Sequence, residues 1–510
     1  MTPLTSRVEG IALGEPSRRA LAEGERRVDF GTLWAQVRAF AAFLRESGIE
    51  SGDRIALILP NGIDAVVAWY GTWLAGGVIV PLNAQARSRD LEPWLRHCEA
   101  RCVVHEGGHR DASMAIDALD STILRVITGA ADPGTAAVHW QDALASTHAA
   151  PVAGGDVGDL AMILYTSGTT GAPKGVMLSH ANIAANVDSI VDYLGLGRDD
   201  SIVSVLPFYY SYGASVLHTH LAVGAYLVIE PNLVFPHTMV ETMARERVSG
   251  FSGVPSTFLL LLNRVPLADY DLSSLRYLTQ AGGAMAPATT QRLREALPRA
   301  RIFIMYGQTE ATARLTWLPP DRLDEKPGAV GIPVAGVEIV VRREDGQPAE
   351  PAEIGEVHAR GPGVMLGYWR NPDATAAVLR DGWLRTGDMG HLDAEGYLFL
   401  SGRRSDMIKT GAHRVHPKDV EEVVAELQEV DEVAVIGVDD DTLGQVIKAL
   451  VVVKSGQALS ANQVKAHCRA RLAIYKIPKF IEFVDALPKT ASGKIRRAQL
   501  TATKEPREVS

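Results

Sequence analysis

A ten-residue polar loop has the composition of a phosphate-binding site. The segment TSGTTGAPKG spans Thr166–Gly175 and follows an apolar run at Leu160–Tyr165. Its glycines leave backbone N–H groups accessible, its Ser and Thr residues add hydroxyl donors, and Lys174 adds a positive charge. It differs from the Walker P-loop, because Pro173 stands where that motif needs glycine before its lysine. We expect it to bind polyphosphate at a strand–helix junction; a flexible surface turn is the alternative.

Three single residues could also carry chemistry, but each has an ordinary structural alternative. Glu310, in MYGQTEAT, is a candidate metal ligand, although an isolated glutamate is more often a surface acid. Asp388 ends GWLRTGD, and an aspartate after glycine is usually a turn residue. Lys494, in LPKTASGK, also fits a solvated basic tail. The residues alone leave these alternatives open.

Hydrophobic periodicity places these residues on an α/β framework. From Arg54 to Pro81, an apolar run, an amphipathic stretch and a second apolar run predict a strand–helix–strand unit, which is typical of a parallel sheet covered by helices. Ser179 is the predicted N-cap of a helix after the polar loop, with an apolar face that begins at Ile183. A third unit has a strand at Tyr226–Ile229 and a helix at His237–Arg247.

The texture changes twice along the rest of the chain. From about Gly336, short β runs with turns predict a β-rich subdomain. After the charged stretch Gly402–Pro417, a small α+β unit begins, with a helix opening at Pro417. Its other predicted elements are strands at Glu432–Val438 and Val446–Val453, a helix at Asn462–Leu472 and a strand at Phe480–Val484. The predicted fold class is α/β: a large multi-layered N-terminal domain with parallel sheets and a β-rich subdomain, plus a small mobile α+β C-terminal domain.

Composition excludes several classes of function. The 510 residues are 46% hydrophobic and 22% charged, which excludes a disordered or low-complexity scaffold. Lys and Arg total 51 against 60 Asp and Glu, giving a net charge of −9, which argues against a general nucleic-acid surface. Three cysteines do not make a disulfide framework, and no stretch has the length of a signal peptide or membrane span. We expect a soluble cytoplasmic protein.

The segment YTSGTTGAPKGVMLSH resembles the signature loop of the adenylate-forming (AMP-binding) enzymes, which include acyl-CoA synthetases, firefly luciferase and the adenylation domains of nonribosomal peptide synthetases. Further matches in the family's order are SGDRIALILPN, QAGGAMA, MYGQTEAT, GWLRTGD, GRRSDMIKTGAHRVHPKDVE and LPKTASGKIRR. The resemblance extends from Phe30 to Arg497. It implies an adenylation domain at residues 1–402, a hinge at residues 403–405 and a C-terminal lid domain at residues 406–510.

The resemblance also implies a role for each matched residue. The β- and γ-phosphates of ATP would be held by Thr166, Ser167, Gly168, Thr169, Thr170 and Lys174. Thr309 would donate to the α-phosphate, and Glu310 would ligate Mg²⁺. The adenine slot and its surroundings would be formed by Gly282, Gly283, Ala284, Tyr306 and Gly307. Asp388 would accept from the ribose hydroxyls with Arg403 beside it, Lys494 would bridge the carboxylate and the α-phosphate, and Ser405 would be the hinge.

The acyl pocket of the family matches the region of LPFYYSYGASVLHTHLAVGA. We expect Tyr209, Tyr210, Tyr212, Gly213 and His218 to line it for an aryl or medium acyl tail, although some of them could merely pack the core. Relatives that activate α-amino acids have Phe-Asp-x-Ser where this chain has Tyr212-Gly213-Ala214-Ser215. Without that carboxylate a buried ammonium has no partner, so an ordinary α-amino acid is disfavoured.

The sequence therefore predicts an ATP-dependent, AMP-forming acid–thiol ligase with coenzyme A as the expected acceptor. A stand-alone acyl-AMP ligase that loads the phosphopantetheine of a carrier protein is the nearest alternative, because the motifs do not separate the two. A luciferase-like oxidase shares the same adenylation half, and an inactive nucleotide-binding module is a different class again. The joint presence of Glu310, Asp388 and Lys494 argues against the inactive module.

Overall fold

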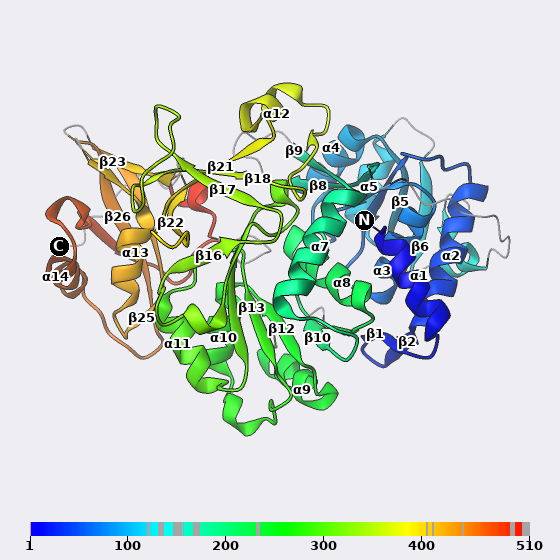
Figure 1. Ribbon diagram of the computed structural model, residues 1–510, viewed down its shortest axis with the longest axis horizontal. Helices are drawn as coiled ribbons and strands as arrows, with labels where there is room; N and C mark the ends of the chain where they lie inside the picture. The colour runs from blue at the N-terminus through cyan, green and yellow to red at the C-terminus, as the bar shows by residue number, and fades with distance from the viewer. Residues whose placement is uncertain are drawn as a thin grey trace.

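The computed structural model describes residues 2–119, 123–130, 137–145, 156, 158–166, 174–230, 235–403, 406–410, 413–440, 443–489 and 495–501. In Figure 1 the N-terminal third and the small C-terminal unit lie at opposite ends of the molecule, with the middle of the chain between them. Within the described residues, no helix combines the length and the apolar character needed to cross a membrane.

The first sheet is the eight-stranded sheet near the N-terminus, in the order β19-β9-β8-β4-β3-β5-β6-β7. Its strands are β3 (Arg54–Ile58), β4 (Val78–Pro81), β5 (Ala100–Glu106), β6 (Leu124–Thr128), β7 (Val138–His139), β8 (Leu160–Thr166), β9 (Lys174–Ser179) and β19 (Gly367–Tyr368). The accompanying helices are α1 (Leu4–Gly14), α2 (Phe30–Glu46), α3 (Ile63–Leu74), α4 (Ser88–Cys98), α5 (Arg110–Asp117) and α6 (Trp140–Leu144). Strands β3 and β4 are parallel and joined through α3, as the sequence predicts.

The second sheet runs through the middle of the molecule, in the order β17-β18-β21-β22-β16-β15-β14-β13-β12-β10-β11-β1-β2, with β20 beside β21. Its first strands are β1 (Arg19–Glu23), β2 (Arg26–Asp29), β10 (Ser201–Ser204), β11 (Tyr226–Ile229), β12 (Gly250–Gly253), β13 (Tyr277–Gln280) and β14 (Arg301–Tyr306). The later strands are β15 (Thr316–Leu318), β16 (Ala329–Pro333), β17 (Glu338–Arg342), β18 (Gly355–Arg360), β20 (Leu379–Arg380), β21 (Trp383–Leu392) and β22 (Leu398–Arg403). Pairing is parallel from β11 to β14 and antiparallel from β15 onward, so the predicted β-rich region continues this sheet.

Helices and short helical turns connect the strands of the second sheet. The helices are α7 (His180–Leu194), α8 (Ser211–Val223), α9 (Pro236–Glu246), α10 (Pro255–Arg264), α11 (Pro287–Ala296) and α12 (Pro372–Val378). The 3-10 turns are η1 (Leu267–Asp269), η2 (Thr309–Ala311) and η3 (Pro320–Arg322). Helices α7 and α8 pack against each other where the two sheets approach (Figure 1).

The C-terminal unit is a third sheet, in the order β24-β23-β26-β25 with β27 beside β26. Its elements are β23 (Ile408–Thr410), β24 (His413–Val415), α13 (Pro417–Ala425), β25 (Val430–Asp440), β26 (Gly444–Val453), α14 (Ala461–Arg471), η5 (Ile474–Lys476), β27 (Phe480–Phe483) and α15 (Arg497–Thr501). Of these, α13, β25, β26, α14 and β27 are the elements that the sequence predicts, with boundaries shifted by a few residues, whereas β23, β24, η5 and α15 were not predicted.

The sequence prediction is wrong about the element that comes after the polar loop. Strand β9 lies between the loop and α7, and it pairs antiparallel with β8, so that Thr166 is opposite Lys174. The loop therefore joins two antiparallel strands instead of a strand and a helix. The N-cap is nevertheless where expected, because Ser179 forms a capping box with Asn182. Since α7 begins one strand later, Lys174 and local N–H groups, and not a helix N-terminus, would supply positive potential to this loop.

Three buried histidines lie on the packed faces of α7 and α8. Burial lowers the pKa of His180 to about 4, of His218 to about 3 and of His220 to about 4, from 6.5. Each is held by aromatic or hydroxyl neighbours: His220 Nε2 lies 2.6 Å from the Tyr277 hydroxyl, and His218 Nδ1 lies 3.1 Å from that of Tyr70. They are therefore neutral in the folded protein at neutral pH.

These histidines should make the protein sensitive to mild acid. Below pH 6.5 the unfolded chain binds protons that the folded chain does not, so stability is complete above that pH and falls as the pH decreases toward 4. Each histidine should cost about 1.4 kcal/mol of unfolding free energy at one pH unit below 6.5. Urea denaturation between pH 7.5 and pH 5 measures the slope. Relative to wild type, His218→Phe should flatten it, whereas His237→Gln, which removes an exposed histidine, should leave it unchanged; equal slopes in all three proteins would contradict this account.

Candidate active site

A buried carboxylate lies where the two halves of the second sheet meet. Asp388 on β21 is directly opposite Arg403 on the antiparallel strand β22, which brings Arg403 Nε to 3.2 Å from Asp388 Oδ1. Tyr306, at the end of β14, donates its hydroxyl to Asp388 Oδ2 at 2.6 Å. Asp388 is only 8% exposed. The paired strands β21 and β22 and the distant strand β14 thus orient one acceptor group.

Electrostatics in this cluster favour a charged arginine and a protonated tyrosine. The Asp388 carboxylate raises the pKa of Arg403 above its ordinary value. Burial, and then the Asp388 charge, raise the pKa of the Tyr306 hydroxyl well above 10, so Tyr306 stays a donor. A carboxylate accepts from several donors at once, which suits it to paired hydroxyls of a sugar.

A second cluster surrounds Glu310 on the turn η2. Tyr368 on β19 donates its hydroxyl to Glu310 Oε1 at 2.8 Å. The Lys174 ammonium lies 5.5 Å from the centre of the same tyrosine ring, because β9 and β19 are paired strands. Burial raises the pKa of Tyr368 above its ordinary value, with the Glu310 charge as the second cause. An acid and a base from different elements therefore face one region, as phosphate and metal binding requires.

The turn that carries Thr309 and Glu310 is backbone-constrained. A Cβ on Gly307 would lie 2.1 Å from the Ala313 carbonyl oxygen, so only glycine fits there. Thr312 has φ 63°, which is rare for a β-branched residue. At the other side of the turn, Thr309 Oγ1 lies 3.4 Å from Ser211 Oγ at the start of α8. The predicted α-phosphate donor is thus next to the helix that carries the predicted acyl-pocket residues.

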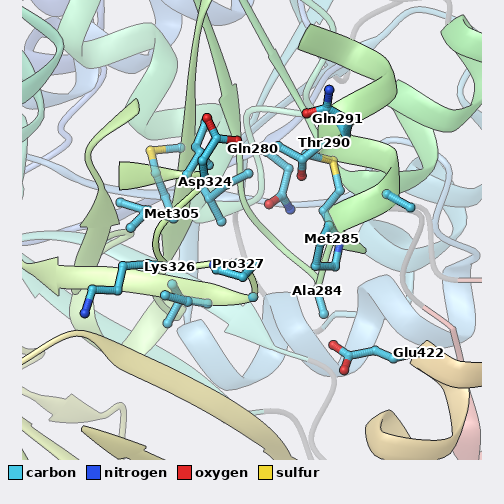
Figure 2. Close-up of a pocket in the computed structure, with 18 of the residues that line it drawn as sticks. Gln280, Ala284, Met285, Thr290, Gln291, Met305, Asp324, Lys326, Pro327 and Glu422 are labelled. Carbon is cyan, nitrogen blue, oxygen red and sulfur yellow. The ribbon is translucent and has the colours of Figure 1, made fainter. Parts of the chain in front are cut away.

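A cavity of about 310 Å³ adjoins the predicted adenine slot. Gly283 and Ala284 line it, and so does Glu422 from helix α13 of the C-terminal unit; Figure 2 shows Glu422 near Ala284. Gln280, 1% exposed, lies among its lining residues; its Nε2 donates to the Gly283 carbonyl at 2.8 Å, and its Oε1 has no hydrogen-bond partner in the structure. The sequence places Gln280 within the QAGGAMA motif but predicts no role for it.

Of the predicted acyl-pocket residues, His218 lines a cavity, whereas the other four make packing or hydrogen-bond contacts within the protein. His218 lines a small buried cavity between α7 and α8. Tyr212 is buried, but its hydroxyl donates to the Thr279 carbonyl at 2.8 Å. Tyr209 and Tyr210 pack on each other with ring centres 4.6 Å apart. Gly213 faces the Pro207 carbonyl, and a Cβ on it would lie 2.1 Å from that oxygen.

Several predicted site residues lie outside the described residues: Ser167, Gly168, Thr169, Thr170, Ser405 and Lys494. Their roles stay predictions. Thr166 and Lys174 bracket the polar loop, and Gly282, Gly283 and Ala284 come after β13, next to Tyr306 at the end of β14. Sequence reasoning missed Tyr368, Asn186 and Ser211. Asn186 lies between Ile183 and Val187 in α7, but a polar residue at such a position is informative only once its hydrogen-bond partners are known, and Tyr368 gave no signal in the sequence.

Comparisons with known proteins agree with this arrangement. The profile of the AMP-binding enzyme family matches residues 9–369, and that of the AMP-binding enzyme C-terminal domain matches residues 419–494. The chain belongs to the AMP-binding enzyme family. A long-chain-fatty-acid–CoA ligase of Bacillus subtilis (strain 168) is 32% identical over 95% of this chain and 91% of that protein. A feruloyl-CoA synthase of Amycolatopsis sp is 33% identical over 95% of this chain and 96% of that protein.

Solved structures extend the family likeness to the fold. A benzoate CoA ligase from Burkholderia xenovorans LB400 superimposes with a TM-score of 0.90 at 28% identity, over 98% of this chain and 100% of that one. An anthranilate CoA ligase in complex with anthranoyl-AMP gives a TM-score of 0.91 at 26% identity, over 98% and 96%. The family resemblance and the α/β fold class predicted from the sequence are therefore confirmed.

The Tyr306–Asp388 hydrogen bond gives a testable consequence in a nucleotide-binding family. Tyr306→Phe removes one donor from a buried carboxylate, and hydrogen bonds to charged groups contribute about 1.5–3 kcal/mol. The KM for ATP should rise by about tenfold or more, with little change in the KM for the acid, in an acid-dependent pyrophosphate-exchange assay. Tyr226→Phe is the matched control, because Tyr226, on β11, also donates its hydroxyl to a carboxylate, that of Glu246 at 3.3 Å. An unchanged KM for ATP in Tyr306→Phe would refute the assignment.

Proposed function

We propose that the Asp388 cluster holds the ribose of ATP and thereby places the α-phosphate at Thr309, where a carboxylic acid is activated. This chain is an AMP-forming acid–CoA ligase. The observation that carries the assignment is that Tyr306 and Arg403 both contact the buried Asp388 carboxylate. The cluster of Glu310, Tyr368 and Lys174 supports it.

The reaction has two half-reactions at one site. A carboxylate oxygen of the acid attacks the α-phosphorus of ATP, and the bond to the β-phosphate breaks to release pyrophosphate. The sulfur of the CoA thiol then attacks the acyl carbon, the thiol proton leaves, and the carbon–oxygen bond to AMP breaks. Lys174 and the segment from Thr166 to Lys174 would neutralise the departing pyrophosphate, and Thr309 would donate to the α-phosphate.

Glu310 fits a Mg²⁺ ligand by its chemistry. It is a partly buried carboxylate that accepts a hydrogen bond from the neutral Tyr368 hydroxyl. Among the described residues, no side-chain cation forms an ion pair with it. Hard oxygen ligands of this kind are what Mg²⁺ selects. When bound, the ion supplies charge neutralisation to the phosphates. Tyr368 would keep the carboxylate oriented toward them.

Domain rotation would separate the two half-reactions. We place the large domain at residues 1–402, the hinge at residues 403–405 with Ser405 as the hinge residue, and the lid at residues 406–510. Among the described residues, polar contacts between the two parts include Lys418, which donates to the Leu400 carbonyl at 2.7 Å, and Asn263, which donates to Asp431 at 3.3 Å. An interface of this kind is compatible with reorientation. Lys494 would reach the carboxylate and α-phosphate in one orientation and withdraw in the other.

The acid substrate would be an aryl or medium acyl acid without an α-ammonium group. Gly213 stands where amino-acid-activating relatives carry aspartate, and the contact of its Cα with the Pro207 carbonyl leaves no room for a side chain. Relatives named for benzoate and ferulate support the aryl class, and one named for long-chain fatty acids supports the acyl class. CoA is the acceptor, and a carrier-protein thiol is the alternative that an acceptor assay separates.

The function is tested by supplying the full-length enzyme with ATP, Mg²⁺ and a panel of aryl and aliphatic acids. Acid-dependent ATP–pyrophosphate exchange should appear, followed by an acyl-CoA when CoA is added. The same reaction with a phosphopantetheine carrier protein in place of CoA should give no acylated product. Absence of ATP–pyrophosphate exchange with every acid would refute the ligase function. If the carrier protein but not CoA became acylated, the carrier-protein thiol would be the acceptor instead of CoA.

Lys494→Ala provides the internal comparison. Exchange should fall by at least about a hundredfold, whereas thioester formation from supplied acyl-adenylate should change little, because Lys494 acts only in the adenylating orientation. Lys489→Ala is the matched control: it removes a lysine five residues earlier, one whose ammonium donates to Glu432 at 2.6 Å. Equal losses in both half-reactions for Lys494→Ala would contradict the proposal that Lys494 acts only in the adenylation half-reaction.

Gln280 would recognise the adenine base by a hydrogen bond to its exocyclic amine. Its Nε2 is engaged by the Gly283 carbonyl, which fixes the amide so that the unpartnered Oε1 can accept from an exocyclic amine. Inosine triphosphate carries an oxygen at that position, so two acceptors would face each other. Buried groups left unpaired in this way discriminate strongly between substrates.

The nucleotide preference of a Gln280→Leu variant tests this role. Its ratio of kcat/KM for ATP over inosine triphosphate should fall by at least about tenfold relative to wild type. Gln291→Leu is the control, since Gln291 lines the same cavity on α11 but pairs with Glu295. A ratio unchanged in Gln280→Leu would show that the adenine amine binds elsewhere.

A further inference from the structure

A narrow slot separates α7 from α8 next to the reaction centre. On α8 its walls are Ser211, Ala214, Ser215 and His218, which are spaced i, i+3, i+4 and i+7 and therefore share one helical face. On α7 the facing residues are Ile183, Asn186 and Val187, spaced in the same way. Small side chains on α8 leave space between the helices, and the slot begins at Ser211, beside Thr309.

Two polar atoms at this slot have no partner. His218 Nε2 and Asn186 Oδ1 are both without a hydrogen bond in the structure, and their residues are 1% and 3% exposed. Their other polar atoms are engaged: His218 Nδ1 lies 3.1 Å from the Tyr70 hydroxyl, and Asn186 Nδ2 donates to the Arg314 carbonyl at 3.1 Å. Buried polar atoms of this kind are rarely left unpaired, because each costs about 1–3 kcal/mol.

The remaining polar groups of the slot are already used. Ser215 Oγ donates to the Tyr212 carbonyl at 2.7 Å, Thr312 Oγ1 donates to the Gly363 carbonyl at 2.7 Å, and Ser211 Oγ lies 3.4 Å from Thr309 Oγ1. The rings of Trp69, Tyr70 and Trp73 pack around His218 and fix its orientation. The slot is therefore apolar except for one imidazole nitrogen and one amide oxygen.

A hydroxyl group satisfies both atoms. If the Tyr70 hydroxyl donates to Nδ1, then Nε2 carries the proton of the neutral imidazole and is a donor, whereas Asn186 Oδ1 is an acceptor in its assigned orientation. A hydroxyl accepts from one and donates to the other. A methyl group at the same place would leave both unpaired, and an ionised carboxylate would repel the amide oxygen.

Size and position agree with a substituent at the far end of the acid. As it stands the cavity is about 10 Å³, which admits roughly one water-sized group. From Ser211 to His218 the helix rises by about 10 Å, so the group bound here lies about two helical turns from the carboxylate end. Met162, which also lines the slot, is a flexible side chain that can yield to the intervening carbons.

We propose that the acid substrate carries a hydroxyl group at its end distant from the carboxylate, and that His218 Nε2 and Asn186 Oδ1 bind this hydroxyl. The proposal rests on the ligase function above and names the class of acid: a hydroxylated aryl or ω-hydroxylated acyl acid. His218 and Asn186 are then specificity-determining residues that touch the substrate.

Paired acids test the proposal on the full-length enzyme. The pairs are benzoate and 4-hydroxybenzoate, cinnamate and 4-hydroxycinnamate, hexanoate and 6-hydroxyhexanoate, and octanoate and 8-hydroxyoctanoate. The acid with the highest kcat/KM in pyrophosphate exchange should be a hydroxylated one, preferred over its partner by at least about tenfold. If the best acid lacks the hydroxyl, the proposal is overturned while the ligase function stands; if no acid supports exchange, the ligase function fails first.

Variants locate the preference in the slot. His218→Phe and Asn186→Leu should each reduce the preference for the hydroxylated acid by at least about tenfold, chiefly through KM for that acid, with the KM for ATP unchanged. His218→Gln, which restores an N–H donor, should recover part of it. His220→Phe is the matched control, because it removes a buried histidine from the same helix outside the slot.

One competing explanation has a distinct outcome. If the two polar atoms serve only to hold a structural water, His218→Phe and Asn186→Leu would lower the thermal midpoint, as His220→Phe also would, while the hydroxyl preference stayed as in wild type. That result would overturn the proposal. Loss of the preference in the two slot variants, with His220→Phe retaining it at a comparable thermal midpoint, would support it.

Discussion

The site depends on one buried negative charge, that of Asp388. Taking a carboxylate out of water is expensive unless charged and hydrogen-bonding partners replace the water. Arg403 and Tyr306 do this from β22 and β14, so the end of a parallel strand is tied to the antiparallel part of the same sheet. Arg403 is also the first residue of the predicted hinge at residues 403–405. Asp388, which would hold the ribose, thus forms an ion pair with Arg403, in the segment about which the C-terminal unit would rotate. Nucleotide binding and the position of the lid would therefore both depend on the Asp388–Arg403 ion pair.

The fold was largely predictable from sequence because its strands and helices are strongly periodic. The Tyr226–Ile229 strand and the Ser179 cap occur where the pattern places them. The error after the polar loop has a physical reason. The six residues of β9 come after a turn-rich loop and lead directly into a well-capped helix, so their short apolar run lacks the length or flanking turn that would separate a strand from a helix start. Pairing with β8 across the loop, and with β19 from distant sequence, makes that segment a strand.

The site was predictable only where family motifs carried it. Asp388, Arg403 and Glu310 were identified from the resemblance, since their types alone fit turn and surface residues equally well. Tyr368 was missed because its role comes from β19 lying beside β9, a contact between residues nearly two hundred positions apart. Gln280 and Asn186 were missed for another reason. A polar residue on an apolar face is informative only when its partners can be counted, and that count requires the tertiary structure.

Unpaired polar atoms divide this active site into two kinds of recognition. In the proposed site, the cationic Lys174 and Arg403 would attract the phosphates of any nucleoside triphosphate, whereas the Glu310 and Asp388 carboxylates would act through a bound cation and through the ribose hydroxyls. At Gln280 and at the His218–Asn186 slot, single neutral atoms are buried in apolar surroundings. Their contribution is a penalty for the wrong ligand more than an attraction for the right one, because a ligand that lacks the matching group leaves them unsatisfied. Charge therefore brings substrates to the site, and a few buried neutral atoms select among them. Under the proposed assignment, the neutral lining of the slot between α7 and α8 could change while the charged end stays fixed, which is compatible with relatives named for benzoate and for long-chain fatty acids.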